Sequence, residues 1–119
     1  MDSNLITYVA LGLLALILLW RTFGPNKKAS AAVILAKIEA GARLIDVRSP
    51  GEFKSGAYPK AINFPLDDLP SKLDRLKPLD KPIIVYCASG ARSAKAAGML
   101  KKAGFTDVIN GGGLSGLPR

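Results

Sequence analysis

The sequence contains no histidine and a single cysteine, Cys87, among its 119 residues. Without histidine, the chain cannot build a Ser-His-Asp triad or a Cys-His pair from its own residues. A structural zinc site would have to rely on one cysteine and carboxylates, which is a poor ligand set for that metal. We therefore expect no metal and no organic cofactor, and any activation of the Cys87 thiol must come from backbone N–H groups, a helix dipole or a cation. A lone cysteine cannot form an internal disulfide, which agrees with a reducing compartment.

Acidic residues are few, because 9 Asp and Glu stand against 17 Lys and Arg and give a net charge of +8. A basic surface favours small anionic ligands and also suits anionic lipid. The lysines are scattered and no aromatic residues interleave with them, which argues against nucleic acid as a partner.

One long run, LITYVALGLLALILLW from Leu5 to Trp20, contains no charge and no proline. With its flanks it covers residues 5–23, about the length of a helix that crosses a bilayer. A segment that is apolar on every face has no core to join in so small a chain. Trp20 suits the aromatic belt at a membrane interface. We expect a transmembrane helix in the lipid bilayer, with a buried helix of a soluble domain as the less favoured alternative.

A cleaved signal peptide is the main alternative interpretation of this segment. A signal peptide usually begins with basic residues, whereas this sequence opens with MDSN. The cations Arg21, Lys27 and Lys28 all follow the run. The positive-inside rule then places the N-terminus outside and the remaining chain in the cytoplasm. We expect a single-pass protein of the cell (inner) membrane, with export after signal cleavage as the alternative. Self-association of the anchor, or pairing with a membrane-protein partner, stays open.

The chain divides into residues 1–28, which hold the span and the short basic linker GPNKK, and residues 29–119, an α/β domain. Ser30 is placed to cap a helix that stops at Gly41. Apolar strands that alternate with helices predict a central parallel sheet flanked by helices on both faces. The predicted strands are 43–47, 61–65 (also buried), 81–87 and 106–110; the predicted helices are 31–40, 70–77 and 91–104, with a helical turn after 48–53 and a flexible end at 111–119.

Cys87 ends the most apolar predicted strand, and the loop CASGAR begins with it. Ligands of open parallel sheets bind beyond the carboxyl ends of the strands. The small side chains at 88–91 let backbone N–H groups converge, and the next helix points its positive end at the same place. A thiol beside a helix N-terminus and a cation such as Arg92 ionises easily, with a pKa that falls from about 8.5 to roughly 3.5–7.5. An inert buried cysteine is the alternative.

The size of this loop distinguishes between two chemistries. Cysteine phosphatases and arsenate reductases hold a tetrahedral oxyanion in a loop one residue longer. Four residues separate Cys87 from Arg92 here, which favours a smaller group, a sulfur atom carried on the thiolate. A phosphatase or arsenate reductase is therefore disfavoured, also because no general acid is evident for a leaving group.

Two segments, LIDVRSPGEFKSGAYPKAINFPL and KPIIVYCASGARSAKAAGMLKKAGFTDVINGGG, resemble the single-domain rhodaneses, or thiosulfate sulfurtransferases, over about residues 30–114. The resemblance implies a rhodanese-like fold and a cysteine, Cys87, that takes sulfane sulfur from thiosulfate or a similar donor as a persulfide. The persulfide sulfur then passes to cyanide or a thiol acceptor. Arg92 would attract the anionic donor. The loop residues implied to hold the persulfide are Ala88, Ser89, Gly90, Ala91, Arg92 and Ser93.

The sequence departs from that family at several positions. Ala57 stands where a histidine is usual and Lys60 where a glycine is usual; we expect Lys60 to be a solvated surface residue. Only KKAS, residues 27–30, is available for the family's first edge strand, so this strand should be missing or short. We expect Asp46 to belong to a buried hydrogen-bond or salt-bridge network and not to the catalytic set.

Two functions remain open at this point. The first is a membrane-anchored sulfurtransferase that moves sulfane sulfur through a Cys87 persulfide. The second is a persulfide-carrying binding or delivery module for a membrane partner, with little small-molecule turnover. The two differ in whether free small acceptors discharge Cys87 at a useful rate.

Overall fold

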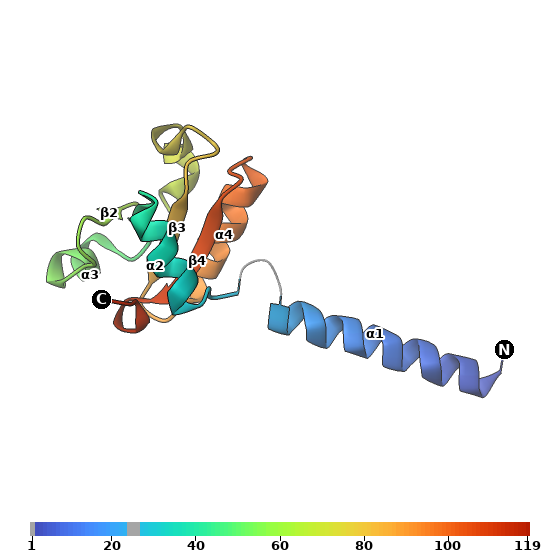
Figure 1. Cartoon of the computed structure of the whole chain (residues 1–119). Helices are drawn as coiled ribbons and strands as arrows, with labels where there is room; N and C mark the ends of the chain where they lie inside the picture. Colours follow the sequence, from blue (N-terminus) through green and yellow to red (C-terminus); the bar gives the residue numbers. More distant parts are fainter. Residues whose placement is uncertain (1, 24–26) are drawn as a thin grey trace.

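The structure is a computed structural model that describes residues 2–23 and 27–119. Residues 24–26 of the predicted linker lie outside this described part. Helices and strands alternate after a long N-terminal helix (Figure 1). The elements are α1 (Ser3–Phe23), α2 (Ala31–Glu39), β1 (Arg43–Asp46), α3 (Pro50–Ser55), β2 (Ile62–Asn63), η1 (Leu69–Leu76), β3 (Ile83–Cys87), α4 (Ala91–Lys102), β4 (Val108–Gly113) and η2 (Leu114–Gly116).

The four strands form one parallel sheet in the order β2-β1-β3-β4. Figure 1 shows α2 on one face of this sheet and α4 on the other. The predicted α/β fold, a central parallel sheet flanked by helices on both faces, is confirmed. The register aligns Asp46 with Tyr86 and Cys87 with Gly113, so the carboxyl ends of three strands meet at one edge.

Strand β3 is buried along its whole length, and its side chains alternate between two cores. Ile84 and Tyr86 pack on the side of α2, where Ile34 is also fully buried. Val85 and Cys87 point to the opposite side, among the buried residues of α4 and η1. The period of two therefore directs the only thiol toward α4.

The start of α2 follows the predicted capping. The Ser30 hydroxyl accepts a hydrogen bond from the Val33 N–H at 3.3 Å. Just before it, Lys28 forms a single parallel bridge with Asn110 of β4, and the Ala29 N–H donates to the Asn110 carbonyl at 2.8 Å. The family's first edge strand is thus reduced to one bridge, as the short segment at 27–30 led us to expect.

Two predictions about the outer parts of the domain are wrong. Residues 61–65 form only the two-residue strand β2 at the sheet edge, where Ile62 is 47% exposed because β2 has β1 as its one neighbour. Residues 111–119 are not a flexible end, since β4 runs to Gly113 and η2 follows. Leu117 is buried in the core beside α2, and the Tyr58 hydroxyl donates to the Pro118 carbonyl.

The segment predicted as a helix at 70–77 is helical. Its hydrogen bonding is that of a 3₁₀ helix, η1, and not that of an α-helix.

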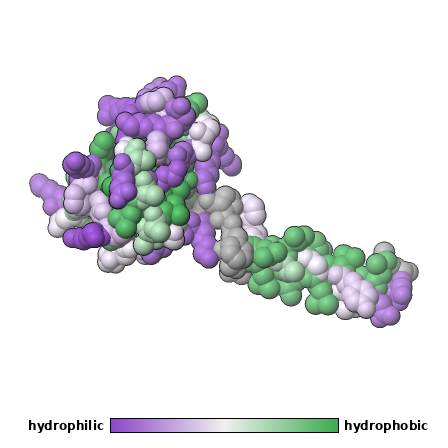
Figure 2. Space-filling model, in the orientation of Figure 1, coloured by the Kyte–Doolittle hydropathy of each residue, from purple (hydrophilic) through white to green (hydrophobic). Residues whose placement is uncertain are grey.

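Helix α1 contains the one stretch of the described residues that is long and apolar enough to cross a membrane, Ser3–Trp20, with a mean hydropathy of 2.0. None of the residues in the stretch Ser3–Trp20 is buried. Figure 2 shows hydrophobic surface along most of α1 and mainly hydrophilic surface on the visible face of the domain. Length and composition fit a bilayer span, and a signal sequence near the N-terminus would fit them too.

Candidate active site

Cys87 is the last residue of β3, as predicted, and its side chain is fully buried. The chain turns sharply after it and begins α4 at Ala91. Gly90 makes this turn with φ +101°, in the left-handed region that favours glycine. Ala88 lies against β4, because a Cβ at Gly113 would be only 2.5 Å from the Ala88 carbonyl oxygen. The close approach of these two backbones fixes the base of the loop.

Three groups of the loop surround the sulfur. The Gly90 N–H donates to Cys87 Sγ at 2.9 Å and the Ser93 N–H donates to it at 3.4 Å. The Cys87 thiol in turn donates to the Ser93 hydroxyl oxygen at 3.4 Å. Ser93 is fully buried, and its hydroxyl donates to the Gly90 carbonyl at 3.0 Å. The predicted convergence of backbone N–H groups on Cys87 is therefore present for these two residues.

These contacts determine how readily the thiol ionises. Burial raises the pKa of Cys87, but the hydrogen bond with the Ser93 side chain and those from the backbone of Ser93, Gly90 and Ser89 outweigh burial. The net result is a Cys87 pKa below its ordinary value. A larger thiolate fraction at neutral pH makes the sulfur a better nucleophile without any histidine.

The Arg92 guanidinium lies beside the loop and forms a bidentate ion pair with Glu52 of α3. The two hydrogen bonds measure 2.7 and 3.0 Å. The Arg92 hydrogen bonds, together with the Ser49 N–H, lower the pKa of Glu52 to about 2, and the Glu52 hydrogen bond raises the pKa of Arg92. Much of the positive charge beside the loop is thus balanced by a carboxylate that the sequence analysis did not single out.

One of the two roles of Glu52, its part in a helix cap, has a signal in the sequence. Ser49 and Glu52 form a capping box at the start of α3, in which the Glu52 N–H donates to the Ser49 hydroxyl and the Ser49 N–H donates to the Glu52 carboxylate. The Ser-x-x-Glu spacing indicates this cap. Its pairing with Arg92, forty residues further along the chain, depends on the fold and has no local signal.

Asp46 and Arg48 form a buried ion pair at the end of β1, with Arg48 Nη2 2.7 Å from Asp46 Oδ2. Arg48 also donates to the Gly56 carbonyl at 2.7 Å, and the Asn63 amide donates to the Asp46 and Arg48 carbonyls. The prediction that Asp46 belongs to a buried network is confirmed. This network joins the ends of β1, α3 and β2 at the edge where Cys87 lies.

A cavity of about 330 Å³ adjoins Arg92. Val47, which lines it, belongs to the same buried cluster as Cys87. Asp67 and Asp68 also line it, so carboxylates and one paired arginine set its charge.

The sequence matches the family described as "Rhodanese-like domain" over residues 30–116. The chain belongs to this family. Among curated relatives, it is 42% identical over 69 residues to the uncharacterized protein YqhL of Bacillus subtilis, covering 58% of this chain and 54% of that protein. It is 35% identical to the thiosulfate sulfurtransferase PspE of Escherichia coli over 88 residues, or 72% of this chain and 84% of PspE.

A solved structure agrees with these matches. The human single-domain sulfurtransferase TSTD1 superimposes with a TM-score of 0.65 and 27% identity, covering 77% of this chain and 91% of TSTD1. The chain spans about half the length of YqhL. The rhodanese-like fold is therefore established.

Proposed function

We propose that this protein is a rhodanese-type sulfurtransferase in which Cys87 carries the transferred sulfur. The observation that carries this proposal is the position of the Cys87 sulfur, which accepts N–H hydrogen bonds from Gly90 and Ser93 and has a lowered pKa. The same N–H groups, with those of Ala88, Ser89, Ala91 and Arg92, are proposed to hold the terminal sulfur of the persulfide.

The proposed reaction has two steps. The Cys87 thiolate attacks the outer sulfur of thiosulfate, the sulfur–sulfur bond of the donor breaks, and sulfite leaves with its electron pair. Cyanide or a thiolate then attacks the terminal sulfur of the persulfide, so thiocyanate or a new persulfide leaves and the Cys87 thiolate is restored. No proton acceptor is needed in either step when Cys87 is already ionised. The similarity to PspE, a thiosulfate sulfurtransferase, supports thiosulfate as the donor.

We further propose that α1 anchors this activity in the cell membrane, with residues 29–119 in the cytoplasm. The apolar window Ser3–Trp20 supports the span, and the basic residues Lys27 and Lys28 that follow it support the orientation. A bilayer anchor of this kind would keep the domain close to membrane-bound donors or acceptors.

Thiocyanate production tests the proposed reaction directly. The full chain in detergent micelles is incubated with thiosulfate and cyanide, and thiocyanate is measured over time. Thiocyanate should form catalytically with the wild type and fall to background with Cys87→Ser, whereas Ser71→Ala, an exposed serine of η1, should behave as the wild type. Equal rates for wild type and Cys87→Ser would overturn the proposal.

The burial of Cys87 favours a second candidate function. Because the thiol has no exposed surface, its persulfide would be sheltered from small acceptors and released to a docked membrane partner. Single-turnover experiments distinguish the two functions: a persulfide that cyanide discharges within the dead time of mixing indicates the enzyme, whereas one that persists for hours indicates the delivery module.

A further inference from the structure

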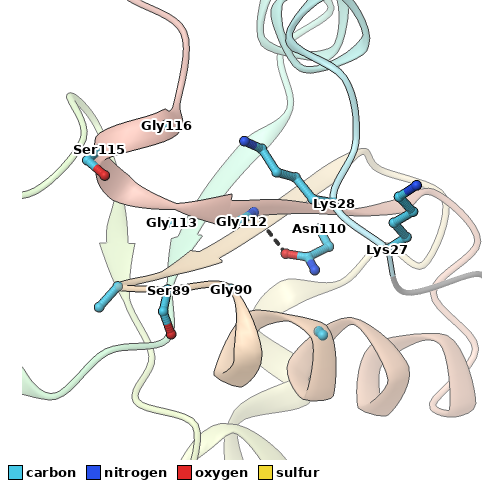
Figure 3. A pocket seen from close by; sticks show the side chains of 11 residues that line it. Lys27, Lys28, Ser89, Gly90, Asn110, Gly112, Gly113, Ser115 and Gly116 are labelled. Carbon is cyan, nitrogen blue, oxygen red and sulfur yellow. Dashed lines mark hydrogen bonds between the residues drawn. The ribbon is translucent and has the colours of Figure 1, made fainter. Parts of the chain in front are cut away.

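A second cavity, of about 500 Å³, lies against the loop that follows Cys87 (Figure 3). Three separate parts of the chain form its walls: the segment before α2, the cysteine loop with the first turn of α4, and β4 with η2. Cys87 itself is not part of the wall. The lining residues are Lys27, Lys28, Ala88, Ser89, Gly90, Ala94, Asn110, Gly112, Gly113, Ser115 and Gly116.

The charge of this cavity is opposite to that of the cavity beside Arg92. Two lysines line it, and none of its lining residues is acidic. The cavity beside Arg92 is lined by Asp67 and Asp68, and Glu52 neutralises its arginine. At this edge of the sheet, the described residues therefore offer an anion a better place beside the lysines than beside Arg92.

Lys28 is held over this cavity by its own backbone and by glycine. Its backbone bridges to Asn110, and its aliphatic chain crosses Gly112 so closely that a Cβ there would lie 2.8 Å from Lys28 Cδ. Its ammonium nitrogen lies 3.2 Å from the position that a Cβ of Gly116 would take. Figure 3 shows the Lys28 side chain extending over β4 toward η2. The Lys28 charge is therefore held at the cavity, with its aliphatic chain over the buried Gly112 and its ammonium group beside the exposed Gly116.

We propose that this cavity binds a phosphate-bearing anion and that, in the anchored protein, the headgroup of an anionic lipid supplies it. An ammonium group over glycine-rich backbone and serine hydroxyls is a common arrangement for phosphate. Only residues 24–27 separate Phe23 from Lys28. An extended chain covers at most about 3.6 Å per residue, so the cavity lies within roughly 18 Å of the end of α1.

This length of chain is what favours a lipid as the source. If α1 spans the bilayer, the cavity is kept within reach of the headgroup region of the leaflet that attracts basic segments. A bound headgroup would hold the sheet edge that carries the Cys87 loop against the membrane surface. The phosphate site itself is independent of sulfur transfer, and only its lipid source rests on the proposed anchor.

The test uses the full ¹⁵N-labelled chain in nanodiscs and follows the amide signals of Ser115 and Gly116 by NMR. In discs of neutral phosphatidylcholine, inorganic phosphate should shift these signals in a saturable manner. In discs that contain phosphatidylglycerol, the same signals should already be shifted, and added phosphate should have little further effect. If phosphate shifts the amide signals of Ser115 and Gly116 but phosphatidylglycerol does not, the phosphate site is supported and the proposal that a lipid supplies the phosphate is overturned.

Three variants make this test specific. Lys28→Gln should weaken phosphate binding about ten-fold, the loss expected for one hydrogen bond to a charged group, and Lys28→Arg should restore much of it. Lys81→Gln removes the same charge at the opposite end of β3 and should bind as the wild type does. Cys87→Ser should also bind normally, which separates a failure of this site from a failure of sulfur transfer. Absence of any phosphate shift, or equal binding by Lys28→Gln and wild type, would overturn the proposal.

Discussion

At the scale of single residues, the reactivity of Cys87 depends on a balance between burial and hydrogen bonding. Burial disfavours the thiolate, and the hydrogen bonds from Ser93, Gly90 and Ser89 favour it. Three of these contributions come from backbone N–H groups, of Ser93, Gly90 and Ser89, that no side-chain substitution removes. The Ser93 hydroxyl is the one group that lowers the Cys87 pKa and that a side-chain substitution can remove without changing the loop backbone.

The variant Ser93→Ala should raise the pKa of Cys87, because it removes the hydrogen bond with the Ser93 side chain, which lowers that pKa, and leaves burial unchanged. The rate of alkylation by iodoacetamide, measured against pH, reports the thiolate fraction. Its inflection should lie below the ordinary thiol value in the wild type and move to higher pH in Ser93→Ala. Ser71→Ala serves as the control, and an unchanged inflection in Ser93→Ala would contradict the assigned role.

Glu52→Gln should increase kcat/KM for thiosulfate about three- to ten-fold, because it removes a negative charge beside the loop and frees Arg92 to attract a dianion. Steady-state rates at low ionic strength measure the effect, and added salt should diminish it. Glu39→Gln, an exposed carboxylate at the end of α2, should have no effect. A lower kcat/KM in Glu52→Gln would show that the ion pair positions Arg92 productively.

At the scale of elements, the site depends on how the ends of β1, α3 and β2 are fastened together. Asp46 and Arg48 are both buried, and each makes further contacts to the backbone of this region. A buried pair adds little net stability compared with apolar residues, but the loss of one partner leaves an unpaired charge. The pair therefore secures this junction more than it stabilises the domain as a whole.

Asp46→Asn should lower the free energy of unfolding by about 3 kcal/mol, because Arg48 remains buried without a counter-charge. Guanidinium unfolding of the full chain in detergent, followed by circular dichroism, provides the measurement. The exposed pair of Asp74 with Lys77 gives a matched control, since Asp74→Asn should change the free energy by less than about 0.5 kcal/mol. Equal losses in the two variants would contradict the structural role of Asp46.

Much of the fold could be predicted from local patterns. Continuous apolar runs identified β1 and β3, the Ser30 cap identified the start of α2, and the alternation of strands with helices gave the parallel sheet. These features depend on residues close in the sequence. The placement of Cys87 at the carboxyl edge follows from them, because it is the last residue of the most apolar strand.

The remaining features depend on contacts between distant segments. The glycines at 111–113 suggest a loop, but they continue β4 because Gly113 must approach the Ala88 carbonyl more closely than any side chain allows. Leu117 is buried only because the chain returns to the core beside α2. Likewise, the ion pair of Arg92 with Glu52 joins α4 to α3, and no short sequence motif predicts this pairing.

At the scale of the whole molecule, the chain combines an apolar helix, in which no residue of Ser3–Trp20 is buried, with a domain that has its own core. By its length and composition this helix fits a bilayer span, which is the environment proposed for it above. The short connection between them brings Lys27 and Lys28 next to the edge that carries the cysteine loop. If α1 anchors the domain as proposed, the proposed sulfur chemistry takes place close to the membrane surface.

C-terminal fusions in a bacterial host test the orientation. A fusion to green fluorescent protein should fluoresce in the membrane fraction, and a fusion to alkaline phosphatase should be inactive, because residues 29–119 are proposed to face the cytoplasm. Replacing Arg21, Lys27 and Lys28 together by neutral residues should weaken the preference for a cytoplasmic C-terminus. Replacing Lys72, Lys77 and Lys81, which lie far from the span in the sequence, should leave this preference unchanged. A soluble chain shortened at its N-terminus would instead establish signal cleavage.

The most direct test of the central claim is the intact mass of the full chain after incubation with thiosulfate. We predict a gain of one sulfur atom, absent in Cys87→Ser, that disappears when cyanide is added while one thiocyanate forms for each sulfur lost. A folded protein that gains no sulfur from thiosulfate or polysulfide, or one that gains it equally in Cys87→Ser, would contradict the claim that Cys87 carries transferred sulfur.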